Sequence, residues 1–220
     1  MRNIIFAVGE YYHVYNRGVE KRDLFVDQKD LQRFAQSMKE FNAVQPIGSI
    51  FESSFKQDDQ QGAQAMTSDA LVEFVAFCVN PNHYHFIVRQ VAEQGVSKYM
   101  HRLGTGYTKY FNTRHERSGA LFQGKFKAKH VHSNEYLLYL SAYVNFNDQI
   151  HQLGSRASKY VLASDQVYLE GAKTFVPVAS DVVMEDFESR DLYKEFSDRV
   201  VQNARKEKGL LYENNGELFD

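Results

Sequence analysis

Two apolar, β-forming runs separated by only three residues constrain the fold of this chain more than any other part of its sequence. The run LVEFVAFCV at residues 71–79 contains a single charged residue, which is typical of a buried central strand. The run HYHFIVRQ follows at 83–90, after the connection Asn80-Pro81-Asn82. Because Asn and Pro favour tight turns, we predict that the two runs form an antiparallel hairpin.

The second run begins with two histidines on either side of a tyrosine. Alternate side chains of a strand share a face, so His83 and His85 should point the same way and Tyr84 the opposite way. Two neutral imidazoles side by side suit a divalent metal. In the simpler alternative, one histidine hydrogen-bonds a neighbour and the other meets solvent. The spacing alone leaves both interpretations open.

The remaining pattern predicts helices packed against this hairpin. Residues 11–17 are rich in β-forming residues in an alternating pattern, which predicts a strand. Asp27 is placed to cap a helix with an apolar face. Apolar residues have helical spacing over residues 97–111 and 134–153, and we expect Asn134 to cap the second of these helices. Between the two helices, the segment KFKAKHV is predicted to be an exposed strand. This order predicts an α+β sandwich with an antiparallel sheet.

Two regions fall outside that pattern. Residues 52–70 are polar and low in complexity, so we expect an insertion or loop there. We place the boundary of the first domain at residue 153. The segment 154–220 is predicted to be an acidic, partly helical C-terminal extension, with an amphipathic helix over 187–208.

Composition indicates a cytoplasmic protein without a membrane segment. No apolar stretch approaches the length of a membrane span, and the apolar run near the N-terminus is too short for a signal peptide. The single cysteine, Cys78, lies within an apolar run, excludes an intrachain disulfide and fits a reducing compartment.

Charge is unevenly distributed, although the net charge is only −2. Residues 98–132 carry eight Lys/Arg and one acid, whereas residues 164–220 carry thirteen acids and seven bases. Aromatic residues interleave with the bases of the first segment, as in surfaces that bind nucleic acid. The alternative is a solvated, salt-bridged face.

The helix predicted over 134–153 carries a polar and aromatic stripe. Tyr136, Tyr143 and Asn147 lie within about 40° of one another on a helical wheel. If the stripe faces the two histidines, imidazole nitrogens and a carboxamide oxygen would form an open site suited to Mg²⁺ or Mn²⁺. A phenol beside such a site and a basic surface points to attack on a phosphodiester, although ordinary core packing also explains a single tyrosine.

The sequence resembles the single-tyrosine transposases of the HUH superfamily, in particular their IS200-like, REP-associated (RAYT) branch. Three elements of the resemblance are specific: PNH-x-H, G-x-LFQG-K-F-K and YLL-x-L-x-x-Y. The matching segments cover nearly all of residues 10–153 in the order of the family. Two departures are Asn80, where the family usually has Met, and Asp148, where it usually has Pro.

The resemblance implies a role for each matching residue. His83 and His85 correspond to the metal-binding pair, Tyr143 to the nucleophile and Asn147 to the side chain that completes the metal site. It also implies a ferredoxin-like (RRM-like) fold, cleavage of single-stranded DNA next to a hairpin, a 5′-phosphotyrosine and a free 3′-OH. Many members are homodimers in which the tyrosine helix can serve the partner's histidines.

We therefore expect a metal-dependent single-stranded DNA endonuclease and strand transferase. One alternative is a non-catalytic hairpin-binding regulator derived from such a transposase, and another is a metal phosphodiesterase in which water attacks. Arg17 could contact the hairpin or simply face solvent in a turn. The basic side chains that we expect to bind DNA are Arg17, Lys109, Arg114, Lys125, Lys127 and Lys129.

Overall fold

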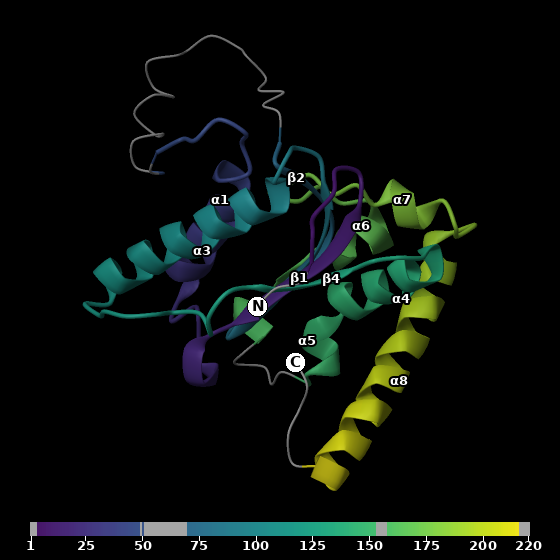
Figure 1. The fold of residues 1–220 in the computed structure, drawn as a ribbon. Helices are drawn as coiled ribbons and strands as arrows, with labels where there is room; N and C mark the ends of the chain where they lie inside the picture. Colours follow the sequence, from purple (N-terminus) through teal and green to yellow (C-terminus); the bar gives the residue numbers. More distant parts are fainter. Residues whose placement is uncertain (1–3, 49, 51–69, 153–157, 216–220) are drawn as a thin grey trace.

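The structure is a computed structural model that describes residues 4–48, 50, 70–152 and 158–215. The insertion expected over 52–70 lies outside these residues except for Ala70. Figure 1 shows the arrangement of the elements. The strands are β1 (Tyr11–Arg17), β2 (Val72–Asn80), β3 (His83–Gln90), β4 (Lys127–His130) and β5 (Leu162–Ala163). The α-helices are α1 (Gln28–Glu40), α3 (Gly95–Arg114), α4 (Asn134–Asn145), α5 (Asn147–Ile150), α6 (Asp165–Glu170), α7 (Asp181–Met184) and α8 (Arg190–Asn215).

The five strands form one antiparallel sheet in the order β4-β1-β3-β2-β5. The first four strands with α1 and α3 give the connectivity βαββαβ, which together with this order defines a ferredoxin-like fold. The predicted α+β class and antiparallel sheet are confirmed. The predicted hairpin is the β2–β3 pair at the centre of the sheet, with one irregularity between Phe74 and Ala76.

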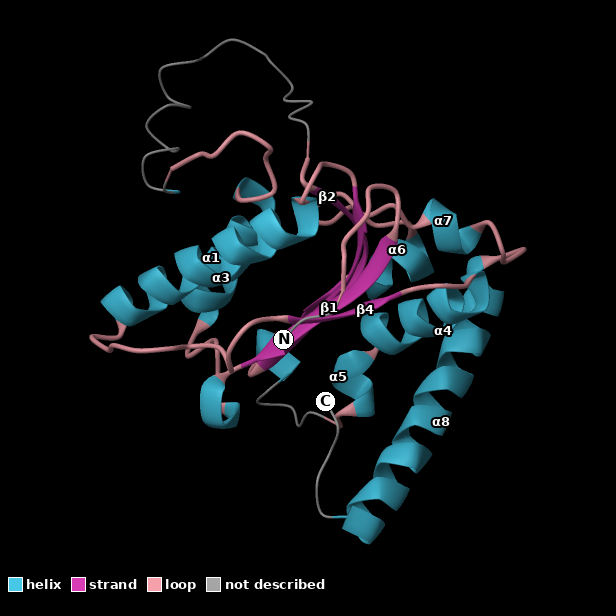
Figure 2. Cartoon of the chain, in the orientation of Figure 1, coloured by secondary structure: helices cyan, strands magenta, loops and turns pink. Residues whose placement is uncertain are grey.

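Helices cover both faces of the sheet (Figures 1 and 2). One face presents Tyr12, Val14, Tyr84 and Phe86, which share a core with α1 and α3. The opposite face, which includes Ile87, packs against α4 and α8. This follows from the strand period of two, since neighbouring side chains of β1 and β3 enter different cores.

A buried carboxylate holds together the two helices on the first face, α1 and α3. Asp27 caps α1, as predicted, by accepting from the backbone N–H groups of Lys29 and Asp30. The side chain of Asp30 is fully buried and accepts from the Arg114 guanidinium and from His115 Nε2, at 2.9 Å in the latter case. These contacts join the start of α1 to the end of α3.

The second helix of this face, α3, is continuous despite its two internal glycines. A Cβ at Gly106 would lie 2.6 Å from ring atoms of Phe41, at the end of α1. The glycine therefore permits close packing of the two helices, which outweighs its low helix propensity.

The last helix predicted for the first domain is shorter than expected. Its cap is Ser133, not Asn134, because the Ser133 hydroxyl accepts from the backbone N–H of Tyr136. The helix breaks at Phe146, which has φ −112° and ψ 27°, and a short helix, α5, follows. Asn147 thus begins a new helical segment instead of continuing the old one.

The C-terminal region packs against the second face of the sheet. Helix α8 contacts α4, α5 and α6, and its Tyr193, Val201 and Ala204 share a core with Val75 and Ile87. Leu192, near the start of α8, is 42% exposed. Among the described residues, no helix is both long and apolar enough to cross a membrane.

Candidate metal and tyrosine site

The hairpin register brings the two histidines to one end of the sheet. His83 pairs with Asn80 on β2 and with Arg17 on β1, while His85 pairs with Cys78 and Tyr15. Both imidazoles are on the α4 face and are buried, at 6% and 4% exposure. Tyr84 belongs to the core on the other face, so the alternation predicted from the sequence is present.

The ring of His83 is oriented by contacts at both of its nitrogens. Its Nδ1 lies 2.6 Å from Asn82 Oδ1, which can only accept, so in the neutral ring Nδ1 carries the proton. The lone pair of Nε2 then faces Asn147 Oδ1 at 3.0 Å and Asn80 Nδ2 at 2.9 Å. An outer partner that fixes the tautomer in this way is typical of metal-binding histidines.

The ring of His85 is held by a third histidine. His13 Nε2 lies 2.9 Å from His85 Nδ1. Burial, with a smaller effect of the neighbouring His13 and His83 rings, lowers the pKa of His85 well below its usual value. Burial and the charge of Lys129 lower the pKa of His13 to about 3. Both rings are therefore neutral near pH 7, as coordination requires.

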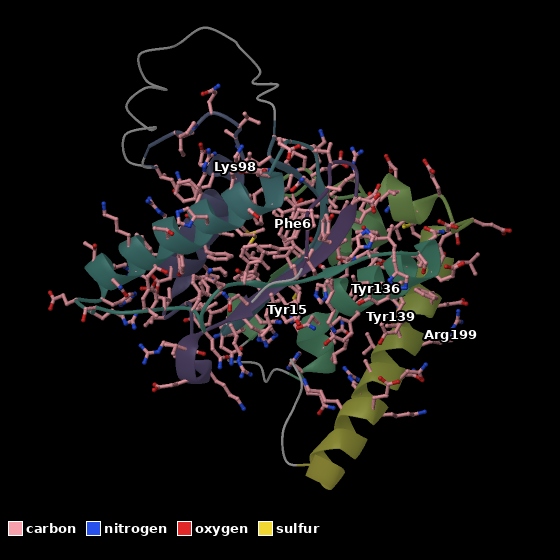
Figure 3. All side chains as sticks on the ribbon, viewed as in Figure 1. Phe6, Tyr15, Lys98, Tyr136, Tyr139 and Arg199 are labelled. Carbon is pink, nitrogen blue, oxygen red and sulfur yellow. The ribbon has the colours of Figure 1, made fainter. Side chains whose placement is uncertain are left out.

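Tyr143 on α4 lies beside this pair. Its ring centroid is 6.0 Å from that of His85, and the two planes are nearly perpendicular. Tyr139 stacks on Tyr143 with 6.3 Å between centroids, and Tyr136 stacks on His132. Figure 3 shows Tyr136 and Tyr139 on the same side of α4. All these groups belong to one chain.

Asn147 completes the cluster from α5. The residue is fully buried, and its Oδ1 accepts from Asn80 Nδ2 at 2.8 Å. Its Nδ2 is buried without a hydrogen-bond partner among the described residues. The carboxamide is therefore oriented with its oxygen toward His83 at the expense of a buried donor, which is a costly arrangement unless that oxygen is needed there.

These donor atoms fit a divalent cation. His83 Nε2 and Asn147 Oδ1 are two acceptors that converge at 3.0 Å, an arrangement favoured by a positive group between them. Within the described parts of the chain, no group of three or more His, Cys, Asp or Glu side chains is placed to hold a metal.

Five of the six expected DNA-binding residues lie in three environments. Arg17 and Lys127 line a cleft of about 20 Å³ together with His83 and His85. Lys129 is exposed on β4, on the same face as Lys127. Lys109 and Lys125 line a separate groove of about 630 Å³ between α3 and residues 120–126.

Arg114 differs from the other basic residues because its guanidinium is already engaged. It donates to both carboxylate oxygens of Asp27, at 2.7 and 2.6 Å, and to Asp30. Arg114 holds α1 against α3, which is a structural role that its sequence context did not indicate. Binding of this side chain to DNA would compete with these ion pairs.

Sequence reasoning missed three site residues. The structure adds Asn80 and His13, described above, and His151, whose ring centroid is 4.6 Å from that of His83. Lys208 Nζ on α8 lies 2.6 Å from His151 Nδ1. For Asn80 a signal was available, since it departs from the family pattern immediately before the hairpin turn.

Comparisons with known proteins concern the family and the fold. Residues 48–147 match the family model described as "Transposase IS200 like". Among solved structures, a REP-associated tyrosine transposase bound to a REP hairpin is similar in fold, with a TM-score of 0.53 and 11% identity. The alignment covers 81% of this chain and 91% of that chain.

A bacterial tRNA(His) guanylyltransferase-like protein in complex with ATP aligns with a TM-score of 0.36 and 9% identity, over 76% of this chain and 71% of that chain. No curated protein matches the chain.

Proposed function

This chain belongs to the IS200-like transposases, and on that premise we propose that it cuts single-stranded DNA next to hairpins through a covalent 5′-phosphotyrosine at Tyr143. The observation that carries the proposal is the position of Tyr143 beside His85 within one chain, with His83 and Asn147 in the same cluster. A phenol, two neutral imidazoles and a carboxamide oxygen are the groups that this chemistry needs.

His83, His85 and Asn147 would hold a divalent cation, Mg²⁺ or Mn²⁺. When bound, such a cation polarises the scissile phosphate and offsets the negative charge of the transition state. The protein's part is to keep both imidazoles neutral and correctly oriented. For His85 to present its Nε2 lone pair, its Nδ1–H must donate to His13 Nε2, so His13 would select the ligating tautomer.

The covalent step exchanges one phosphodiester for another. The Tyr143 Oη attacks the scissile phosphorus, and the bond between phosphorus and the 3′ oxygen breaks. The phenolic proton leaves to solvent, and the departing 3′ oxygen takes up a proton to become a free 3′-OH. The resulting phosphotyrosine retains the phosphodiester energy, so the same step in reverse joins the strand to a new 3′-OH.

Basic side chains around the cleft would position the DNA. Arg17 and Lys127 line the histidine cleft and can contact phosphates next to the scissile bond. Lys109, Lys125 and Lys129 would extend the contact beyond the site. Hairpin DNA is the proposed substrate because the solved relative is bound to a REP hairpin. We also propose a cytoplasmic location, in agreement with the single buried thiol.

The test is covalent capture of DNA. Wild type and the Tyr143→Phe and His83→Ala variants are incubated with a labelled single-stranded hairpin from the gene's own flanks, with Mn²⁺ or with chelator. On a denaturing gel, wild type should give a metal-dependent protein–DNA adduct, and both variants should reduce it to background. Tyr139→Phe is the matched control, since it removes a phenol stacked on Tyr143 and should leave the adduct intact.

Other outcomes identify the alternatives. An adduct that persists in Tyr143→Phe assigns the nucleophile to another tyrosine. Cleavage without an adduct indicates attack by water, as in a metal phosphodiesterase. Salt-sensitive hairpin binding without cleavage in any metal indicates a non-catalytic regulator.

A further inference from the structure

Three polar atoms of the site form a nearly equilateral triangle. Asn80 Nδ2 lies 2.9 Å from His83 Nε2 and 2.8 Å from Asn147 Oδ1, and these two atoms are 3.0 Å apart. All three residues are buried, with Asn80 and Asn147 at 0% exposure. The triangle therefore lies within the protein, where its geometry is set by packing.

These distances match one face of a coordination octahedron. Adjacent ligands of a cation bound at about 2.1 Å are about 3 Å apart, since they subtend a right angle at the metal. His83 and Asn147 already occupy two corners of that face. The third corner holds the amide nitrogen of Asn80, which donates to the two acceptors and so stands where a ligand atom would be.

We propose that Asn80 is a further metal ligand, whose carboxamide turns over when a divalent cation binds and presents Oδ1 in place of Nδ2. The proposal rests on the metal-dependent function proposed above and adds a ligand to it. The turn exchanges the two ends of a planar amide that are nearly equal in size, so it requires no movement of the backbone.

Turning the amide breaks the two hydrogen bonds that Asn80 Nδ2 donates, whose acceptors would then face the cation, and a third, weak one at Asn80 Oδ1. Asn80 Oδ1 now faces Cys78 Sγ at 3.6 Å, and a thiol is a poor hydrogen-bond donor. The Asn80 amide nitrogen lies between two acceptors that would otherwise repel each other. In the metal-bound protein its oxygen would face the cation.

Two substitutions distinguish a ligand from a hydrogen-bond donor. Asn80→Leu keeps the approximate shape and removes both functions. Asn80→Asp keeps an oxygen that can bind metal, but the ionised carboxylate cannot donate to His83 or Asn147. A ligand role predicts that Leu weakens Mn²⁺ binding at least about tenfold and that Asp preserves or strengthens it. A purely positioning role predicts that both substitutions weaken binding.

The measurement is titration calorimetry of the full chain with Mn²⁺ alone, without DNA. Mn²⁺-induced increases in melting temperature provide a second readout and report whether each variant is folded. Asn80→Ala replaces the Leu variant if that variant does not fold. Cys78→Ala is the matched control, because it alters the neighbour of the Asn80 oxygen without removing an amide, and should bind Mn²⁺ as wild type does.

The inference is overturned if Asn80→Leu binds Mn²⁺ as tightly as wild type, or if Asn80→Asp binds as weakly as Asn80→Leu. Either result leaves the proposed function standing when wild type binds Mn²⁺ and forms the DNA adduct. Absence of Mn²⁺ binding by wild type would instead refute the metal-dependent function itself. The two failures are therefore separable.

Discussion

Asp30 is a buried carboxylate, and its hydrogen bonds and ion pairs stabilise the fold. Its side chain has no exposed surface, yet it accepts from the Val26 backbone N–H at 2.9 Å, from Tyr110 Oη at 3.3 Å, and from Arg114 and His115. A buried carboxylate is tolerable only with partners of this kind. The residue links the β1–α1 connection, α1 and α3 through a single pair of oxygens.

Substitution of Asp30 by Asn should therefore destabilise the fold strongly. The change removes the buried one of the two carboxylates that Arg114 contacts and leaves a neutral amide against Arg114 and His115. We expect the free energy of unfolding to fall by about 3 kcal/mol, as for other broken buried pairs. Urea denaturation at neutral pH measures it. Asp27→Asn is the control, because Asp27 is 44% exposed and Asn is an equally good helix cap, so its effect should be much smaller. Equal effects of the two variants would contradict this view of Asp30.

Individual site residues differ in how far sequence could predict them. His83 and His85 follow from strand alternation, and Tyr143 with Asn147 from helical spacing together with the family resemblance. His13 and Asn80 reach the site through strand register, which places His13 against Ile87 and Asn80 against His83. Strand register depends on the pairing of segments that are distant in the sequence. The local sequence pattern therefore does not show directly which residues will lie opposite one another.

At the level of elements, α8 is attached to α4 by a buried phenol. Tyr193 is fully buried, accepts from Asn145 Nδ2 at 2.9 Å and lies 3.2 Å from Ser141 Oγ. Burial raises the pKa of Tyr193 to about 12. The phenol is therefore a neutral hydrogen-bonding group between two helices, in addition to its stacking on Tyr168.

Substitution of Tyr193 by Phe should loosen α8. The change removes an acceptor from the buried amide of Asn145, which typically costs about 2 kcal/mol. Hydrogen exchange should become faster in α8 and α4 while the β2–β3 hairpin stays protected. Tyr136→Phe is the control, because no hydrogen bond from the Tyr136 hydroxyl is present among the described residues. Unchanged exchange in α8 would show that packing alone holds the helix.

The elements themselves were predicted to different degrees. The hairpin, α1 and α3 have strong periodicity and appear close to their expected positions. The break at Phe146 was not foreseen, since the apolar spacing continues through it and neither Gly nor Pro marks it. The packing of α8 against the second core was also missed, because an amphipathic pattern identifies a buried side but not the surface that covers it.

At the scale of the whole molecule, Tyr143, the proposed nucleophile, and the two histidines lie side by side in the same chain. The ring of Tyr143 is 6.0 Å from that of His85, and the connection from β3 to α4 lies entirely within described residues. The homodimer implied by the family resemblance is therefore not needed to bring Tyr143 to a pair of histidines. It stays a proposal about assembly.

A mixing experiment tests whether the site functions within one chain. Tyr143→Phe and His83→Ala chains are co-purified with different tags and incubated together with the hairpin and Mn²⁺. We expect no DNA adduct above the sum of the separate variants, because each chain lacks one half of its own site. Restored adduct would show that the tyrosine of one chain serves the histidines of another.

The edge strand β4 determines which substitutions of its lysines the protein can accept without aggregating. It has only four residues and ends the sheet beside β1, with Lys127 and Lys129 exposed. Short, lysine-bearing edges resist pairing with the edge of another molecule, since like charges would be forced together. Replacing both lysines by neutral residues would remove phosphate contacts and, at the same time, open a path to sheet-to-sheet aggregation. Charge reversal to Glu would abolish the attraction for phosphate while keeping that protection.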